Sequence, residues 1–254
     1  EEAQRVQEAV NETGRKFMAG MTFRFRPQTP IIQKLIKDGT MGDLYYCKAT
    51  YLRVRGVPGW YTWFTDKKRS GGGVLIDLGV HLIDYFWFLL GKPKFKSVSA
   101  FATDIISRRH AAGEPAGFPP VGYPKTYTGP EPDGRFDVDE LTTALIRFDN
   151  GAVLNLELAW ALNTDQPIMG GYLYGSRAGI DVGTLKLTRD KGEEMVEEEI
   201  EFPKVRSHGL EAEQFLEYLR GERENPAPVE DAVEVMRVLD ATHKSIEEKR
   251  EIEL

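Results

Sequence analysis

Hydrophobic and polar residues alternate in several stretches of the chain, and this period of two predicts strands. Two such stretches cover residues 44–54 and 94–103. The stretch ELTTALIRFDNGAVLNLELAW (140–160) holds two more, joined by Asp149-Asn150-Gly151, which is a strong hairpin signal. GGYLYGSRAGIDVGTLKLTRD (170–190) predicts further hairpins, and EEMVEEEIEFP (193–203) predicts a charged outer strand.

A helical period appears in the other segments. Apolar residues recur every three or four positions in residues 1–13, 29–38, 70–91, 209–221 and 229–249. The hairpins follow one another without intervening helices. We therefore predict an α+β fold, with an open, mostly antiparallel sheet and helices packed on one of its faces.

The second face of this sheet would need a cover of its own. We assign Leu154, Leu156, Leu158 and Trp160 to that face, where they would form an apolar patch. In a chain of this size we expect a second subunit to supply the cover, giving a homodimer or homotetramer through the open sheet face.

The first 26 residues differ in character from the rest. The helical pattern of residues 1–13 ends at Gly14, and residues 16–21 predict a short strand. We interpret residues 1–26 as the last helix and strand of a preceding α/β domain. Residues 27–254 then form a substrate-binding and oligomerisation domain. It carries a Pro/Gly-rich arm at about 105–137, for which we favour a mobile surface arm over a lid.

Composition narrows the classes of function. The formal net charge is −7 and no basic stripe with interleaved aromatics occurs, which disfavours a nucleic-acid or membrane partner. Apolar runs fall short of the roughly 18 to 20 residues that span a bilayer, and acidic residues open the chain where a signal peptide would be apolar. The single cysteine, Cys47, fits a buried thiol in a reducing cytoplasm.

The helix predicted in SGGGVLIDLGVHLIDYFWFLLG (70–91) carries the candidate chemistry. It is apolar almost all round and therefore buried, yet it holds Asp77, His81 and Asp84 at spacings of four and three. Buried carboxylates are costly unless they are paired. One reading is a satisfied core network, with a carboxylate paired to an arginine. Another is a site in which Asp77 accepts a hydrogen bond from His81 and raises its basicity. A metal site is a third reading, and we expect none.

Residues around this helix offer binding surfaces. Gly71, Gly72 and Gly73 allow close approach of a ligand or a neighbouring element, or form a flexible join. They match no phosphate-binding pattern. Aromatic rings and cationic donors meet in the preceding loop, which suits sugar rings, a nicotinamide face or an oligomer interface. The candidates there are Trp60, Trp63, Lys68 and Arg69.

At this point the sequence resembles a known family. GGGVLIDLGVHLIDYFWFLLGKP is similar to the D-x-G-x-H-x-x-D helix of the glucose-fructose oxidoreductase / inositol dehydrogenase / MocA-like (Gfo/Idh/MocA) oxidoreductases. MAGMTFRFRP, LIKDGTMGDLYYCKATYLRVRG, the 140–160 hairpin and the last two helices match further segments of that family in order. The resemblance implies the C-terminal domain, similar in fold to that of dihydrodipicolinate reductase. The N-terminal Rossmann domain, with its glycine fingerprint and Glu-Lys-Pro lysine, has no counterpart here, and the cofactor-binding residues are unknown.

The resemblance also implies roles for the site residues. His81 and Asp77 would form the catalytic acid/base pair, while Asp84, Gly72 and Gly73 would be structural. Arg24 would lie near the domain junction, as a salt-bridge partner or as a substrate contact.

Three functions remain open on the sequence. The first is an oxidoreductase that moves a hydride between NAD or NADP and a sugar, polyol or cyclitol; this chain alone would bind no cofactor and be inactive. The second is an NAD-dependent glycoside hydrolase on the same scaffold. The third is a non-catalytic dimerising domain that binds a sugar.

Overall fold

The computed structural model describes residues 1–112 and 135–254. Most of the predicted arm therefore lies outside the described residues. Within 105–137 the structure shows a short helix, α5 (Ile105–Ala111), and an irregular segment from residue 135 that leads into the sheet.

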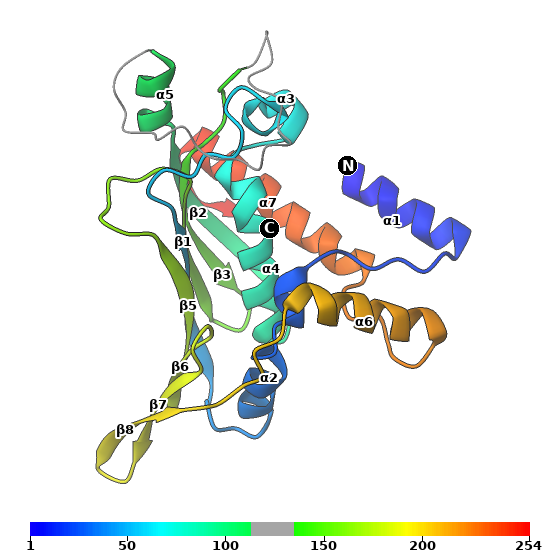
Figure 1. The fold of residues 1–254 in the computed structure, drawn as a ribbon, viewed down its shortest axis with the longest axis vertical. Helices are drawn as coiled ribbons and strands as arrows, with labels where there is room; N and C mark the ends of the chain where they lie inside the picture. The colour runs from blue at the N-terminus through cyan, green and yellow to red at the C-terminus, as the bar shows by residue number, and fades with distance from the viewer. Residues whose placement is uncertain (113–134) are drawn as a thin grey trace.

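Within the described ranges, one nine-stranded sheet forms the centre of the fold, in the order β8-β7-β6-β5-β1-β4-β3-β2-β9 (Figure 1). Every pair is antiparallel except β1–β4, which is parallel. The predicted α+β class with a mostly antiparallel sheet is confirmed. The strands are β1 (Leu44–Leu52), β2 (Phe95–Thr103), β3 (Leu141–Phe148), β4 (Val153–Ala159), β5 (Ile168–Gly175), β6 (Ala178–Asp181), β7 (Lys186–Lys191), β8 (Glu194–Glu199) and β9 (Ile252–Glu253).

The helices gather on one side of the sheet, apart from α5, which lies at one end of it (Figure 1). In the described ranges these are α1 (Glu2–Thr13), α2 (Thr29–Lys37), α3 (Lys67–Ser70), α4 (Val80–Leu89), α5, α6 (Ser207–Arg220) and α7 (Val229–Glu248), with short turns η1 (Thr22–Phe25), η2 (Trp63–Thr65) and η3 (Leu75–Gly79). The strand predicted at residues 16–21 is wrong. This segment is extended, but its Ala19 N–H bonds the Ala227 carbonyl in the loop before α7, so it joins no sheet.

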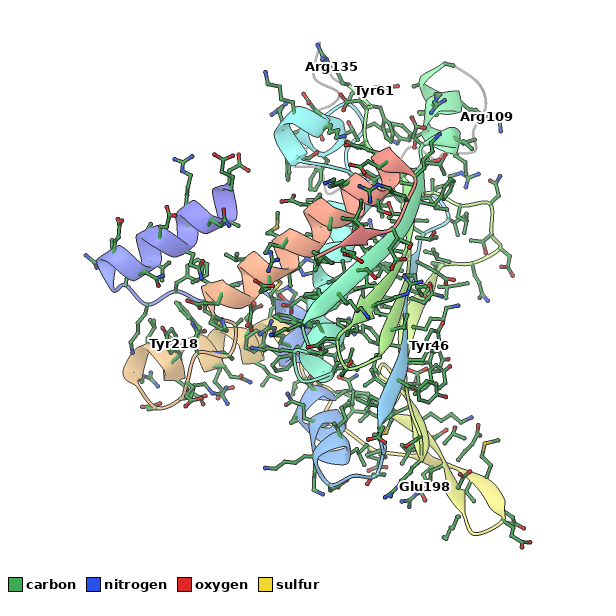
Figure 2. The ribbon with its side chains drawn as sticks, turned by 180° about the vertical axis from the view of Figure 1, so that it is seen from behind. Tyr46, Tyr61, Arg109, Arg135, Glu198 and Tyr218 are labelled. Carbon is green, nitrogen blue, oxygen red and sulfur yellow. The ribbon has the colours of Figure 1, made fainter. Side chains whose placement is uncertain are left out.

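The opposite face of the sheet carries aromatic and polar side chains. Tyr46 of β1 stacks on Tyr174 of β5 at 5.7 Å, and Tyr172 continues the row at 5.9 Å. Lys48 pairs with Glu157 beside them. Figure 2 shows Tyr46 on the side of the sheet away from the helices.

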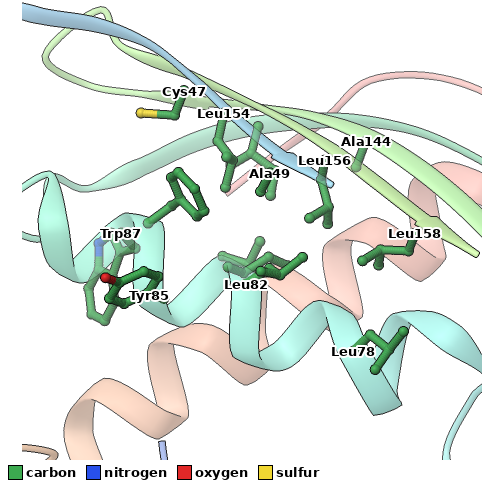
Figure 3. Close-up of a cluster of buried hydrophobic side chains, with 14 of the residues drawn as sticks. Cys47, Ala49, Leu78, Leu82, Tyr85, Trp87, Ala144, Leu154, Leu156 and Leu158 are labelled. Atoms are coloured by element: carbon green, nitrogen blue, oxygen red, sulfur yellow. The ribbon is translucent and has the colours of Figure 1, made fainter. Parts of the chain in front are cut away.

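The leucines of β4 face the helices. Leu154, Leu156, Leu158 and Trp160 have no exposed surface, and Figure 3 shows the three leucines opposite Leu78 and Leu82. The assignment of these four residues to the uncovered face is therefore wrong. Adjacent side chains in a strand point to opposite faces, and the apolar set of β4 is the one that packs under α4.

Length and composition alone would let the segment Lys67–Leu89 cross a membrane. However, 72 % of its most apolar window is buried inside the fold. Packing under the sheet therefore accounts for its hydrophobicity.

Two adjacent glycines in β5 test this packing. A Cβ on Gly171 would lie 2.2 Å from Cζ of Phe86 and 2.9 Å from the Lys48 carbonyl, whereas a Cβ on Gly170 meets nothing within 4 Å. We expect Gly171→Ala to lower the free energy of unfolding by about 1–3 kcal/mol through overpacking. Gly170→Ala should change it by less than about 0.5 kcal/mol. Urea unfolding followed by tryptophan fluorescence measures both, and equal effects would contradict the packing described here.

Candidate active site

We call the continuous helical segment formed by η3 and α4 the site helix. Its three ionisable candidates lie in two kinds of helical turn. Asp77 belongs to η3, a π-helical stretch in which the Val80 N–H bonds the Leu75 carbonyl, and His81 and Asp84 belong to α4. A π turn is wider than an α turn. The four-residue spacing therefore does not stack Asp77 directly over His81, as the sequence suggested. Single π turns inside helices occur often at functional sites.

Asp77 is held by the sheet. Its Oδ2 accepts a hydrogen bond from Nε1 of Trp160 at 2.9 Å, and the Trp160 indole is fully buried at the end of β4. Among the hydrogen bonds of the described residues, none joins Asp77 to His81. The expected direct bond between the carboxylate and the imidazole is therefore not seen in the described residues, where the Trp160 indole binds Oδ2 of Asp77.

The imidazole of His81 remains partly exposed. Its Nδ1 is buried and has no hydrogen-bond partner in the described structure. The ring lies 5.6 Å from that of Phe23 in η1. Burial lowers the pKa of His81, opposed by the negative charges of Asp77, Asp84 and Glu211, while the positive charge of Arg26 lowers it further. A neutral imidazole near pH 7 can accept a proton.

Asp84 and Arg24 form a buried ion pair. Nε and Nη2 of Arg24 donate to the two carboxylate oxygens of Asp84 at 2.8 and 2.6 Å, and Nη1 donates to Asp231 at 2.6 Å. Both Arg24 and Asp84 side chains are 1 % exposed. Burial raises the pKa of Asp84, against the bonds from Arg24. The substrate-contact assignment of Arg24 is corrected here, because its guanidinium is enclosed and occupied and ties α4 to α7.

Asp139 holds the beginning of the site helix. Its carboxylate accepts the N–H groups of Gly73 and Leu75 at 2.9 and 3.1 Å, and its carbonyl accepts that of Val74 at 3.0 Å. A Cβ on Gly73 would lie 1.9 Å from this carbonyl, and one on Gly72 would lie 2.9 Å from Nε2 of His243. These two glycines permit close packing of protein against protein. The same contacts occupy the N–H groups that a phosphate would need.

The predicted binding loop lies at one end of the molecule, beside α3 and α5 (Figure 1). The Trp60 ring packs 4.5 Å from His110 and 5.1 Å from Phe136. Trp63 is 40 % exposed and stacks on Phe64 at 3.9 Å. Lys68 and Arg69 are exposed on α3. Their role as substrate contacts stays a prediction.

Sequence reasoning missed three residues that shape the site. Trp160 was assigned to the wrong face, and Asp139 gave no signal beyond its place before a strand. Arg26 stands two residues after Arg24 in FRFRP, and the sequence alone does not distinguish the paired arginine from the other. A candidate metal centre is also missing: the described residues contain no group of three or more His, Cys, Asp or Glu suited to an ion.

The fold and this helix define a class of protein. An open mixed sheet, covered on one face by a helix that carries a partly exposed histidine and a held aspartate, describes the C-terminal domain of nucleotide-dependent oxidoreductases of the Gfo/Idh/MocA type. The chain belongs to this family: the profile described as "Oxidoreductase family, C-terminal alpha/beta domain" matches residues 33–254. The resemblance stated from the sequence is confirmed.

The chain is similar to several sugar and cyclitol dehydrogenases. It is 28 % identical to D-glucoside 3-dehydrogenase of Escherichia coli over 100 % of this chain and 69 % of that protein. It is 31 % identical to inositol 2-dehydrogenase of Rhizobium meliloti over 42 % of this chain and 31 % of that protein. The solved structure of levoglucosan dehydrogenase in complex with NADH and levoglucosan superposes with a TM-score of 0.78 at 19 % identity, covering 99 % of this chain and 70 % of that one. The chain thus spans about two-thirds of the length of the E. coli protein.

The ion pair that anchors the site helix can be tested by stability. Arg24→Ala leaves the carboxylate of Asp84 buried and unpaired, so we expect a loss of about 3–5 kcal/mol in the free energy of unfolding. The matched control is Arg237→Ala, which breaks an exposed pair with Glu234 on α7 and should cost less than about 1 kcal/mol. Chemical denaturation monitored by circular dichroism gives both values. Similar losses for the two variants would refute the anchoring role.

Proposed function

We propose that the parent protein is an NAD(P)-dependent oxidoreductase that transfers a hydride between nicotinamide and a carbon of a sugar, polyol or cyclitol. In this proposal the present chain supplies the substrate-binding and acid/base residues. The proposal is supported by family membership and by the printed activities of the relatives, which are a glucoside, a levoglucosan and an inositol dehydrogenase. Substrate identity is proposed only as this class.

The observation that carries the proposal is the partial exposure of the His81 imidazole together with its lowered pKa. A partly exposed imidazole with a lowered pKa is neutral near pH 7 and suited to accept a proton. The helix that carries it is anchored through Asp84 and capped by Asp139, and neither interaction depends on His81.

In the oxidation direction His81 takes the proton of the substrate hydroxyl as the carbonyl forms. A nicotinamide cofactor, when bound, would supply the acceptor for the hydride that leaves the same carbon. Asp77 carries a negative charge beside the imidazole and stabilises the imidazolium that results. The hydrogen bond from Trp160 keeps the carboxylate in place while this charge develops. In reduction the imidazolium returns the proton to the substrate oxygen.

The glycine-rich start of the site helix is not available to the phosphates of a cofactor. The helix N-terminus that follows Gly71-Gly72-Gly73 is occupied by Asp139, so its N–H groups are unavailable to a pyrophosphate. We therefore assign binding of the NAD(P) phosphates to another part of the parent protein. Inactivity of the isolated chain follows as a further part of the proposal.

The tyrosine-rich face of the sheet supports a second proposal of the same kind. Exposed Ile168 and Phe101 accompany the row of Tyr46, Tyr172 and Tyr174 on a surface that no described helix covers. We propose that parent subunits associate through this face as a dimer or tetramer. We also propose a cytoplasmic location, supported by the single cysteine.

Replacement of His81 tests the mechanism in the full-length protein. We expect His81→Ala to lower kcat roughly 10²- to 10⁴-fold, the range for a lost general base. The control His208→Ala alters an exposed histidine on α6 and should leave kcat unchanged. NAD(P)H formation from D-glucosides, inositols and levoglucosan is the measurement. Normal turnover by His81→Ala would remove this residue from the mechanism, and release of free sugar without net NAD(P)H would favour the hydrolytic alternative.

The pH dependence of oxidation gives an independent test. Because burial lowers the pKa of His81 and the neutral form is the base, kcat/KM should rise with pH through a value below the ordinary pKa of about 6.5 and be flat above it. Asp77→Asn removes a negative charge that raises this pKa, so the rise should move to lower pH. Initial rates between about pH 4.5 and 9 measure the two profiles. A limb that stays in place in Asp77→Asn would mean that His81 does not control it.

A further inference from the structure

The guanidinium of Arg26 packs on aromatic rings beside the site helix and not against acidic side chains. Arg26 directly follows η1, and its guanidinium carbon lies 3.7 Å from the ring centre of Phe23 and 5.5 Å from that of Tyr85. The side chain is half-buried between these rings. Cation–π contact stabilises the guanidinium plane and leaves its five N–H donors to be satisfied.

These donors have no partner within the described part of the chain. The contacts of the Arg26 side chain there are the two aromatic rings, and no carboxylate or carbonyl bonds its guanidinium. Arg24, two residues earlier, bonds Asp84, Asp231 and the Pro226 carbonyl. Burial lowers the pKa of Arg26, against weaker raising effects of Tyr85 and Tyr51. The fold thus retains a partly desolvated charge without compensating it, which is costly unless a counter-charge arrives from elsewhere.

This cation and the candidate base share an aromatic neighbour. Phe23 contacts both the Arg26 guanidinium and the His81 imidazole. The charge of Arg26 also acts on His81, whose pKa it lowers. Glu211 on the neighbouring α6 accepts a hydrogen bond from the Thr22 hydroxyl at 2.8 Å. Arg26 and His81 thus lie beside one ring of the site, and no described residue uses the guanidinium donors.

We infer that Arg26 binds an oxyanion of the substrate, a carboxylate or a phosphate carried by the sugar or polyol that His81 deprotonates. This inference rests on the proposed function and narrows its substrate class to acidic or phosphorylated sugars. A guanidinium offers two parallel N–H donors that match the two oxygens of such a group, at a geometry that a lysine ammonium cannot reproduce. Two other sources of an oxyanion are a phosphate of NAD(P) and a carboxylate from elsewhere in the parent protein.

Matched substrates test the inference in the full-length protein. Methyl D-glucoside and methyl D-glucuronide differ in one carboxylate, and D-glucose 6-phosphate adds the phosphate case. We expect wild-type kcat/KM to favour an anionic compound. Arg26→Gln should lower that value about 10- to 150-fold, mainly through KM, the range for a lost hydrogen bond to a charged group. Turnover of the neutral glucoside should change less than about 3-fold, and Arg26→Lys should restore part of the loss.

Two further measurements keep the outcomes distinct. Calorimetric binding of the glucuronide to the full-length protein reports on Arg26 without turnover. Loss of binding in Arg26→Gln supports the inference even if no substrate is oxidised, a result that would defeat the proposed function alone. Arg26→Gln should also move the pH limb of neutral-substrate oxidation upward, because a charge that lowers the pKa of His81 is removed. The control is Arg237→Gln, which should change none of these values.

Three results would overturn the inference. One is a wild-type preference for the neutral glucoside that Arg26→Gln leaves unchanged. Another is a raised KM for NAD(P) with an unchanged KM for every sugar, which would assign the guanidinium to a cofactor phosphate. The last is a loss of folded protein in Arg26→Gln that Arg26→Lys fully repairs without any effect on sugar binding, which would assign it to a carboxylate of the parent.

Discussion

The fold depends on one buried ion pair, in which Arg24 neutralises the carboxylate of Asp84 within an apolar helix. The leucines of the site helix pack against β4. An unpaired carboxylate in this apolar environment would be strongly destabilising. Asp84 is stabilised because Nε and Nη2 of Arg24 bond its two oxygens, while Nη1 bonds Asp231 on α7. One guanidinium thereby fixes η1, α4 and α7 relative to one another. The position of His81, one turn before Asp84, follows from that anchor.

A second constraint acts on the other end of the same helix. Asp139 caps its first turn and stands at the start of β3, and Trp160 at the end of β4 binds Asp77. The backbone N–H of Trp160 also donates to the carbonyl of Glu140, the residue after Asp139. Two neighbouring strand ends therefore hold both the cap and the carboxylate, so the position of Asp77 depends on the sheet as well as on the helix.

The sequence predicted much of this architecture and less of its detail. The Asp149-Asn150-Gly151 hairpin, the alternating strands and the apolar site helix were readable because each depends on local periodicity. The face on which the β4 leucines lie was not, since alternation gives two faces and does not say which one the helices cover. The π turn at Leu75–Gly79 has no local sequence signal, so the expected bond between Asp77 and His81 could not be excluded beforehand. The strand predicted at residues 16–21 does not form because the segment pairs with the loop before α7 and not with a strand, and such pairing is set by tertiary structure.

The two arginines of FRFRP, Arg24 and Arg26, are alike in the sequence but have different partners in the structure. Arg24 is compensated at every donor group by acidic and carbonyl oxygens, whereas Arg26 rests on aromatic rings with its donors unsatisfied in the described chain. A structural cation is stabilised by its partners, and a binding cation is kept in place by contacts that leave its donors available. Phe23 provides such a contact and also touches His81. The same ring, in the short segment Thr22–Phe25, is thus a neighbour of both the proposed binding cation and the proposed base, so that a change at Phe23 would affect both.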